Sequence, residues 1–178
     1  MNYHKLETAS IGNGPGFRVV LWLSGCSHHC PGCQNPETHD PAGGRHFGNA
    51  AFRQLLHALS NPWIDGLTLS GGDPFYHGNL AAVRSLLSEI RKWFPQKSIW
   101  VYTGDTLQLS DFLRQAPGMA TADDRHAILQ MADVVVDGMY LEPARDLTLA
   151  FRGSRNQRLI DCKATIASGR LITLEEEA

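Results

Sequence analysis

Short hydrophobic runs alternate along the chain with stretches whose apolar residues recur at helical spacing. Apolar runs bounded by turn signals predict buried strands at residues 18–23, 66–69, 98–102 and 134–136, and a further strand that begins at 159. Apolar positions three and four residues apart predict helices at residues 49–59, 80–93, 107–115 and 123–131. The pattern therefore indicates an α/β protein in which strands and helices alternate.

This alternation also constrains the topology. A strand, a helix and a second strand form a crossover that leaves the two strands parallel. The 178 residues suffice for one domain, but not for the roughly 250 residues of a closed eight-stranded barrel. We therefore predict a single domain over residues 1–178, built as an incomplete, TIM-like barrel of parallel strands with alternating helices. Residues 162–178 are predicted to form a C-terminal tail, with a solvated end at 175–178.

Charge and hydropathy exclude several classes of protein. Lysine and arginine number 16 against 18 aspartates and glutamates, which gives a formal charge of −2. No strong field is therefore available to hold nucleic acid or an anionic membrane. The first residues contain no apolar segment of the secretory type, and the run at 19–23 is too short to span a bilayer. We expect a cytoplasmic protein that binds neither nucleic acid nor membrane.

Three of the four cysteines crowd into eight residues. Cys26, Cys30 and Cys33 have the spacing C-x3-C-x2-C, whereas Cys162 lies near the C-terminus. A disulfide framework fits this pattern poorly, because the sequence shows no export signal and cytosolic thiols stay reduced. The Pro-Gly pair inside the triplet suits a tight loop, since proline fixes φ and glycine tolerates positive φ. The triplet therefore indicates a metal site.

Two kinds of metal site remain open from the spacing alone. A structural zinc site needs four ligands, and the fourth could come from any of four residues: His28, His29, His39 or Cys162. A [4Fe–4S] cluster takes one thiolate per iron, so three thiolates would leave one iron with an open coordination position. An open position is how a metal site admits a substrate or cofactor.

Glycine-rich or polar turns follow the predicted parallel strands. They are the cysteine loop after residue 23 and the turns at 70–74, 103–104 and 137–138. Ligands of parallel α/β folds bind at the carboxyl ends of the strands, so we expect these turns to line one crevice. The two glycines of the 70–74 turn would let backbone carbonyls approach an ammonium group closely. The same turn lacks the lysine of a phosphate-binding loop.

Several segments taken together resemble a known family. They are Asn-Gly-Pro-Gly-Phe-Arg at 13–18, Ser-Gly and the cysteine triplet at 24–33, Gln-Asn-Pro-Glu-Thr at 34–38, Ser-Gly-Gly-Asp-Pro at 70–74, Trp-Val-Tyr-Thr-Gly at 100–104, Val-Asp-Gly at 136–138 and Phe-Arg-Gly-Ser-x-Asn-Gln at 151–157. The chain is similar to the activases of glycyl radical enzymes, a branch of the radical S-adenosylmethionine superfamily. Within that branch it most resembles the activating proteins of anaerobic (class III) ribonucleotide reductases. The resemblance covers residues 1 to about 161.

This resemblance implies the cofactors and the residues that hold them. Cys26, Cys30 and Cys33 would bind three irons of a [4Fe–4S] cluster. S-adenosylmethionine would lie against Gly32, Cys33 and Gln34. Its methionyl amino end would be received by Gly71, Gly72 and Asp73. Reductive cleavage would give methionine and a 5′-deoxyadenosyl radical. The cofactor would then carry the radical, and no catalytic side chain is expected.

The resemblance also implies partners. The radical would take a hydrogen atom from a glycine in the large subunit of an anaerobic ribonucleotide reductase, and an electron donor such as a flavodoxin would reduce the cluster. Arg152, Arg155 and Arg158 are predicted either to contact that glycine loop or the cofactor, or to form a solvated basic turn. Gly32 and Gln34 depart from the pattern, because an aromatic residue often occupies one of these two positions in related proteins.

Three other functions are compatible with the same residues. The chain could activate another glycyl radical enzyme, or it could be a small radical S-adenosylmethionine enzyme that acts on a small molecule. It could also be a zinc or iron–sulfur binding module without enzymatic activity. The role of Cys162 is left open by the sequence.

Overall fold

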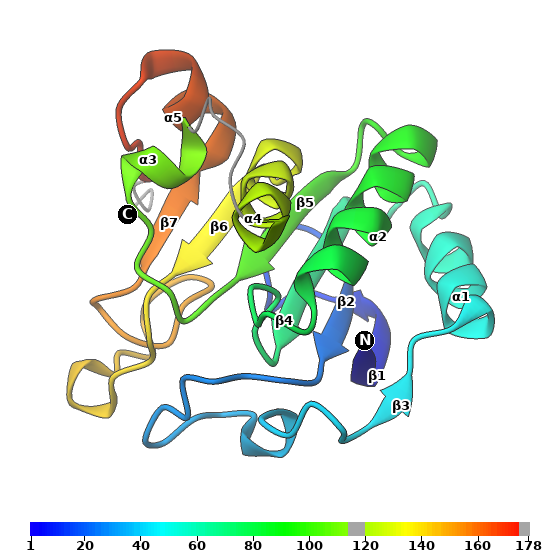
Figure 1. The fold of residues 1–178 in the computed structure, drawn as a ribbon, viewed down its shortest axis with the longest axis horizontal. Coiled ribbons are helices and arrows are strands. Elements are labelled where there is room, and N and C mark those ends of the chain that lie inside the picture. Colours follow the sequence, from blue (N-terminus) through cyan, green and yellow to red (C-terminus); the bar gives the residue numbers. More distant parts are fainter. Residues whose placement is uncertain (114–119, 175–178) are drawn as a thin grey trace.

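The computed structural model describes residues 1–113 and 120–174, which form one mixed sheet with helices (Figure 1). In these residues the sheet has seven strands, in the order β3-β1-β2-β4-β5-β6-β7. The strands are β1 Asn2–Ser10, β2 Arg18–Leu23, β3 Arg45–His46, β4 Gly66–Gly71, β5 Ser98–Tyr102, β6 Val134–Asp137 and β7 Arg158–Asp161. The helices are α1 Asn49–Leu59, α2 Leu80–Trp93, α3 Leu109–Phe112, α4 Ala120–Met131 and α5 Cys162–Ser168, with short 3-10 helices at Pro36–Thr38 and Glu142–Ala144.

The centre of the sheet is parallel, as the alternation of strands and helices predicted. β2, β4, β5 and β6 are neighbours and run in the same direction. Helix α1 lies between β2 and β4 in the chain, α2 between β4 and β5, and α3 with α4 between β5 and β6. The helices predicted at 49–59 and 80–93 are confirmed with the same bounds. The carboxyl ends of all four parallel strands therefore meet at one edge of the molecule.

The edges of the sheet differ from the prediction of parallel strands throughout. β1 and β7 pair antiparallel with β2 and β6, and β3 pairs antiparallel with β1. A short connection joins β1 to β2, and antiparallel strands need no crossover helix. β3 and β7 are the two ends of an open sheet, so the predicted incomplete TIM-like barrel is not confirmed.

Both faces of the central strands are buried. One face belongs to a large apolar cluster that includes Leu21 of β2, Leu69 of β4, Leu55 of α1 and Leu87 of α2, and the helices cover this face (Figure 1). The other face contributes to a smaller cluster: Trp100, Val134, Val136 and Leu159, with Tyr102 and Phe151 packed against them. Residues 138–157 therefore help to cover the face of the sheet opposite to α1 and α2.

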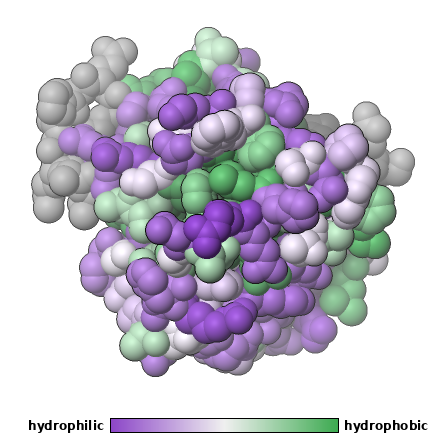
Figure 2. Space-filling view, turned by 90° about the vertical axis from the view of Figure 1, so that its right-hand side faces the viewer, coloured by the Kyte–Doolittle hydropathy of each residue, from purple (hydrophilic) through white to green (hydrophobic). Residues whose placement is uncertain are grey.

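The surface beside α1 agrees with this arrangement. The side of the molecule at the right of Figure 1 is mainly hydrophilic, with apolar groups gathered in small areas between polar ones (Figure 2). Arg53 and Gln54 of α1 are exposed, whereas Leu55 and Leu59 are fully buried. The helix thus presents its apolar stripe to the sheet and its polar face outward.

The segment after β7 is folded where the sequence predicted a tail. Asp161 accepts a hydrogen bond from the Ala164 N–H at 2.8 Å and so caps the start of helix α5, whose end is followed by Gly169 with φ 65°. The chain then returns along β7, where Thr173 pairs with Ile160. The predicted solvated end at 175–178 lies outside the described residues.

Two helix boundaries also differ from the prediction. The helix predicted at 107–115 is formed only over α3, and residue 115 lies outside the described residues. Helix α4 begins at residue 120 rather than 123. Among the described residues, no helix has the length and apolar character needed to cross a membrane.

Candidate functional site

The cysteine loop leaves the carboxyl end of β2 and is closed by main-chain hydrogen bonds at its base. The Gly25 N–H donates to the Thr38 carbonyl at 2.8 Å, and the Cys26 N–H donates to the His39 carbonyl at 3.1 Å. Inside the loop the Cys33 N–H donates to the Cys30 carbonyl at 3.0 Å. These contacts fold a loop of about fifteen residues back on itself, so that the cysteines lie near the strand end.

The three cysteines of the triplet line one cleft, as predicted. Cys26, Cys30 and Cys33 are free thiols and partly exposed, and the cleft has a volume of about 400 Å³. Partial burial raises the pKa of the Cys26 and Cys33 thiols. Thiolates are the form that binds metal, so a bound cation would offset the cost of ionising them. Cys162 is also free, but it is completely buried at the start of α5.

The Gly-Gly-Asp-Pro turn at the end of β4 lines the same cleft and is joined to the cysteine loop. The Gly72 N–H donates to the Leu23 carbonyl at 2.9 Å, and the Asp73 N–H donates to the Gly25 carbonyl at 2.8 Å. A Cβ at Gly72 would lie only 2.7 Å from the Gly25 carbonyl oxygen. The turn therefore approaches the loop more closely than a side chain would allow, which explains glycine at this position.

Asp73 lines the cleft, but its carboxylate is held by protein groups. The side chain is 3% exposed. One oxygen accepts the Phe75 N–H at 2.7 Å, and the other is 2.7 Å from His28 Nε2 and accepts the Thr103 hydroxyl at 3.1 Å. The sequence predicted Asp73 as a cofactor contact and did not reveal these partners. The carboxylate thus joins the turns after β4 and β5 to the cysteine loop.

His28 is the residue of the loop that reaches this carboxylate. Its Nε2 also lies 3.3 Å from Asp105, whose carboxylate forms an ion pair with Arg125 at 2.5 Å. The hydrogen bond that His28 donates to the Asp73 carboxylate raises the pKa of His28. A Cβ at Gly104 would lie 2.4 Å from the His28 ring, so the glycine leaves room for the imidazole. The position of His28 between two cysteines was a signal in the sequence, but its partners were not.

Residues 138–157 form the wall of the cleft opposite the Gly-Gly-Asp-Pro turn. Gln157 organises this wall: its Oε1 accepts the N–H groups of Gly153 and Ser154 at 2.9 and 3.1 Å, and its Nε2 donates to the Gly138 carbonyl at 3.0 Å. The sequence did not predict this role for Gln157. It explains why the Arg-Gly-Ser-x-Asn-Gln segment folds as a compact turn.

The wall also touches the cysteine loop. A Cβ at Gly32 would lie 2.7 Å from the Glu142 carboxylate and 3.4 Å from the Tyr140 ring, and Gly32 has φ 75°. Gln34 is close to Gly153 in the same region. Gly32, predicted as a cofactor contact, is therefore also the point where the loop and the wall approach each other.

The three arginines of the C-terminal segment have different surroundings. Arg158 Nε donates to the buried Asp137 carboxylate at 2.9 Å, which fixes the start of β7 to the end of β6. Arg155 pairs at the surface with Asp146 at 3.3 Å. Arg152 lines the cleft. Of the three, Arg152 alone is placed to meet a ligand or a partner that enters the cleft.

The chain is similar over most of its length to proteins of one kind. A family model described as a 4Fe-4S single cluster domain matches residues 12–160. Proteins named anaerobic ribonucleoside-triphosphate reductase-activating protein match from Vibrio cholerae (37% identical; 88% of this chain and 96% of the relative), Enterobacteria phage T4 (38%; 89% and 93%) and Escherichia coli K12 (38%; 88% and 96%). Cys26, Cys30 and Cys33, the cleft and its wall all lie within the residues that the family model matches. The chain therefore belongs to the family of anaerobic ribonucleoside-triphosphate reductase-activating proteins and contains a 4Fe-4S single cluster domain.

Proposed function

We propose that this protein is an oxidoreductase that activates an anaerobic ribonucleoside-triphosphate reductase by generating its glycyl radical, through reductive cleavage of S-adenosylmethionine at a [4Fe–4S] cluster. The observation that carries the proposal is the convergence of three free thiols and the Gly-Gly-Asp-Pro turn on one cleft. Family membership supports the same activity, because the relatives bear the name of a reductase-activating protein.

The donor set fits a cluster with one open iron. Cys26, Cys30 and Cys33 would each hold one iron. Cys162 is fully buried and directly follows Asp161 of β7, which pairs with Val134 at the amino end of β6. It therefore lies at the edge of the sheet opposite to the cysteine loop and offers the loop no fourth thiolate. A closed zinc site is less well supported, because His28 Nε2 is engaged by Asp73 and the rings of His29 and His39 contact each other.

S-adenosylmethionine is the proposed ligand of the remaining space. A cleft of about 400 Å³ is within the range of small-molecule sites. Gly71 and Gly72 would offer backbone atoms to the methionyl amino end, while Gly32, Cys33 and Gln34 would line the side of the cysteine loop. When bound, the cluster and its cofactor would supply an electron and then a 5′-deoxyadenosyl radical, which removes a hydrogen atom from a glycine of the reductase.

The chain itself would bind, orient and shield. The turn at 70–74 and the wall at 138–157 would set the position of the ligand between them, and partly buried aromatic residues such as Tyr102 and Phe151 would exclude water. This activity needs no acid–base pair in the cleft. Free thiols suit the reducing cytoplasm, where we place the protein, and a flavodoxin or similar reductant would supply the electron.

Two measurements test the proposal in sequence. Protein purified without oxygen and reduced with dithionite should convert S-adenosylmethionine to methionine and 5′-deoxyadenosine. Addition of the anaerobic reductase should then give a glycyl radical, seen as a doublet by electron paramagnetic resonance, and a reductase with alanine in place of its glycine should give none. If the cofactor is cleaved but a small molecule is modified instead of the reductase, the chain is a different radical S-adenosylmethionine enzyme.

A further inference from the structure

Two consecutive histidines of the cysteine loop point to different surroundings. The His28 side chain is only 16% exposed and reaches the ends of β4 and β5. His29 is exposed, and its ring contacts His39 within the same loop at a centroid distance of 4.7 Å. The pair therefore contains one residue that joins the loop to the sheet and one that does not.

The carboxylate that His28 contacts belongs to two turns at once. Asp73 Oδ1 accepts the Phe75 N–H within the turn after β4. Asp73 Oδ2 accepts the Thr103 hydroxyl at 3.1 Å and lies 3.4 Å from the Gly104 nitrogen, both in the turn after β5. A hydrogen bond from His28 to this carboxylate thus connects the cysteine loop with two strand ends.

A second carboxylate supports the same ring. Asp105 lies 3.3 Å from His28 Nε2 and is paired with Arg125 of α4. The Arg125 guanidinium lies 4.8 Å from the centre of the Phe75 ring, directly beyond the Gly-Gly-Asp-Pro turn. The cysteine loop and the turns after β4 and β5 therefore meet at one imidazole, and α4 is joined to them through Asp105.

We propose that His28 is a positioning residue that holds the stretch from Cys26 to Cys30 at a fixed spacing from Gly71 and Gly72. The inference rests on the proposed function, in which a cluster on the loop and a cofactor on the turn must meet. Hydrogen-bonded partners just outside a ligand set fix the orientation of the ligands, and their loss costs about 10–100-fold in metal affinity or activity. His28 contributes such a partner from inside the ligand loop itself.

The experiment compares three variants of the full chain, each reconstituted with iron and sulfide without oxygen. His28→Ala removes the contact, and His28→Gln retains a hydrogen-bond donor. His29→Asn is the matched control, because His29 has φ 47° and asparagine tolerates that conformation. The readouts are iron content, the dissociation constant for S-adenosylmethionine, and amide hydrogen exchange of residues 26–33 and 71–75 without S-adenosylmethionine.

His28→Ala should keep its iron, because all three thiols remain. Its dissociation constant for S-adenosylmethionine should rise about tenfold or more, and exchange should increase in both segments together. His28→Gln should recover part of both effects, and His29→Asn should behave as the wild type.

Four results would overturn the inference. They are unchanged affinity together with unchanged exchange in His28→Ala, loss of iron in this variant comparable to that of a cysteine variant, faster exchange in one segment only, and equal effects in His29→Asn. If the wild type itself does not bind S-adenosylmethionine, the proposed function fails instead. In that case the amide hydrogen exchange of residues 26–33 and 71–75 in His28→Ala still shows whether His28 couples these two segments.

Discussion

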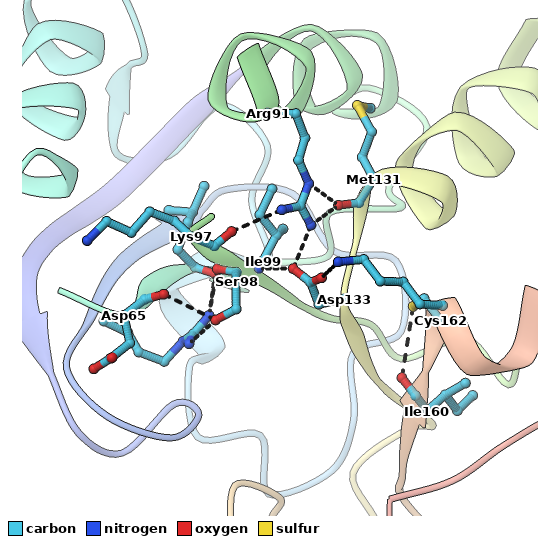
Figure 3. Close-up of polar contacts among 12 residues, drawn as sticks. Asp65, Arg91, Lys97, Ser98, Ile99, Met131, Asp133, Ile160 and Cys162 are labelled. Carbon is cyan, nitrogen blue, oxygen red and sulfur yellow. Dashed lines mark hydrogen bonds and ion pairs between the residues drawn. The ribbon is translucent and has the colours of Figure 1, made fainter. Parts of the chain in front are cut away.

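At the amino ends of the parallel strands, Asp133 pairs with Arg91 and both side chains also bond to the backbone (Figure 3), and Lys163 pairs with the same Asp133. At the carboxyl ends, three free thiols face a cleft. Arg91 donates to the Met131 carbonyl at 2.8 Å and to the Lys97 carbonyl at 3.0 Å. Each hydrogen bond to a charged group contributes about 1.5–3 kcal/mol. The amino end therefore uses its charges to hold the fold.

Arg18 adds further hydrogen bonds at the same edge of the sheet. Its side chain is fully buried at the start of β2, where Nε donates to the Thr68 hydroxyl at 2.7 Å and Nη1 donates to the Ser98 hydroxyl at 2.8 Å. Burial lowers the pKa of Arg18 to about 10. A buried guanidinium is tolerated here because several acceptors converge on it.

The cleft at the carboxyl end combines glycines, thiols and the saturated carboxylate of Asp73, while the Asp137 carboxylate at the end of β6 is held by Arg158. Gly72 and Gly104 leave room for neighbouring groups, and the thiols remain available to a ligand. The contrast teaches that a cluster of charged side chains in this protein indicates stability, whereas closely packed glycine turns and partly exposed thiols indicate the site. Asp73 with His28 is the instructive exception, because it is a saturated pair that lies inside the site.

The sharpest test of this contrast uses the four cysteines. Cys26→Ala, Cys30→Ala and Cys33→Ala should each abolish the cluster, whereas Cys162→Ala should retain about four irons per chain. Burial raises the pKa of Cys162, so its thiol resists the ionisation that metal binding needs. Iron and sulfide analysis of protein purified without oxygen provides the measurement. If Cys162→Ala lost as much iron as the other three variants, the amino and carboxyl ends of the sheet would not differ in metal binding.

A second prediction concerns the space around Gly72. Gly72→Ala should weaken binding of S-adenosylmethionine about tenfold or more, because the new Cβ would meet the carbonyl oxygens of Gly25 and Leu23 at 2.7 and 3.0 Å. Iron content should be retained. Gly12→Ala is the matched control, since Gly12 lines the same cleft but a Cβ there would meet nothing within 4 Å. Equal affinities in the two variants would remove the 70–74 turn from the binding site.

Asp133→Asn should act on stability alone. Partial burial raises the pKa of Asp133, but hydrogen bonds from Lys163 and Arg91 outweigh it and leave the pKa below its usual value. We expect a loss on the order of 2 kcal/mol in the free energy of unfolding at pH 7, measured by denaturant titration. Iron content and affinity for S-adenosylmethionine should not change, and a change in either would contradict the division between the two ends.

The pH dependence of this loss follows from the direction of the shift. A lowered pKa in the folded state means that the carboxylate stabilises the fold above the ordinary value of about 3.9. The stabilisation disappears as the pH falls through the lower folded pKa. The difference between wild type and Asp133→Asn should therefore be full at neutral pH and shrink below about pH 4.

The smallest effects are expected at the rim of the cleft. Arg152→Ala should reduce the radical yield on the reductase a few-fold, because Arg152 lines the cleft through which the partner would approach. Arg155→Ala is the control: its contact with Asp146 is exposed, so it should change neither stability nor radical yield measurably. A larger loss of radical yield in Arg155→Ala than in Arg152→Ala would place the contact with the reductase outside the mouth of the cleft.

The elements of the core were predictable because their signals are local. The apolar stripe of α2 and the apolar run of β2 identify them without knowledge of their neighbours. The same reasoning missed β1, since this half-exposed strand buries only Tyr3 among its residues. The direction of β7 was also missed, because a short apolar run does not reveal whether its partner runs parallel or antiparallel.

The site was predictable to a similar extent. The cysteine spacing and the position of turns after strands sufficed to predict that the thiols and the glycines of 70–74 share a cleft. The hydrogen bonds of Asp73 to His28 and Thr103 depend on contacts 30 to 45 residues apart. The partners of Gln157 lie nearer in the sequence, 3 to 19 residues away, but no periodic pattern of the sequence marks them.

The contact of Gly32 with Glu142 has a consequence for biosynthesis. One side of the cleft is encoded more than a hundred residues after the other, and a chain grows at about 5–20 residues per second. The thiols are therefore synthesised several seconds before the wall that faces them. During that interval the side of the cysteine segment that Glu142 and Tyr140 later approach has no wall beside it.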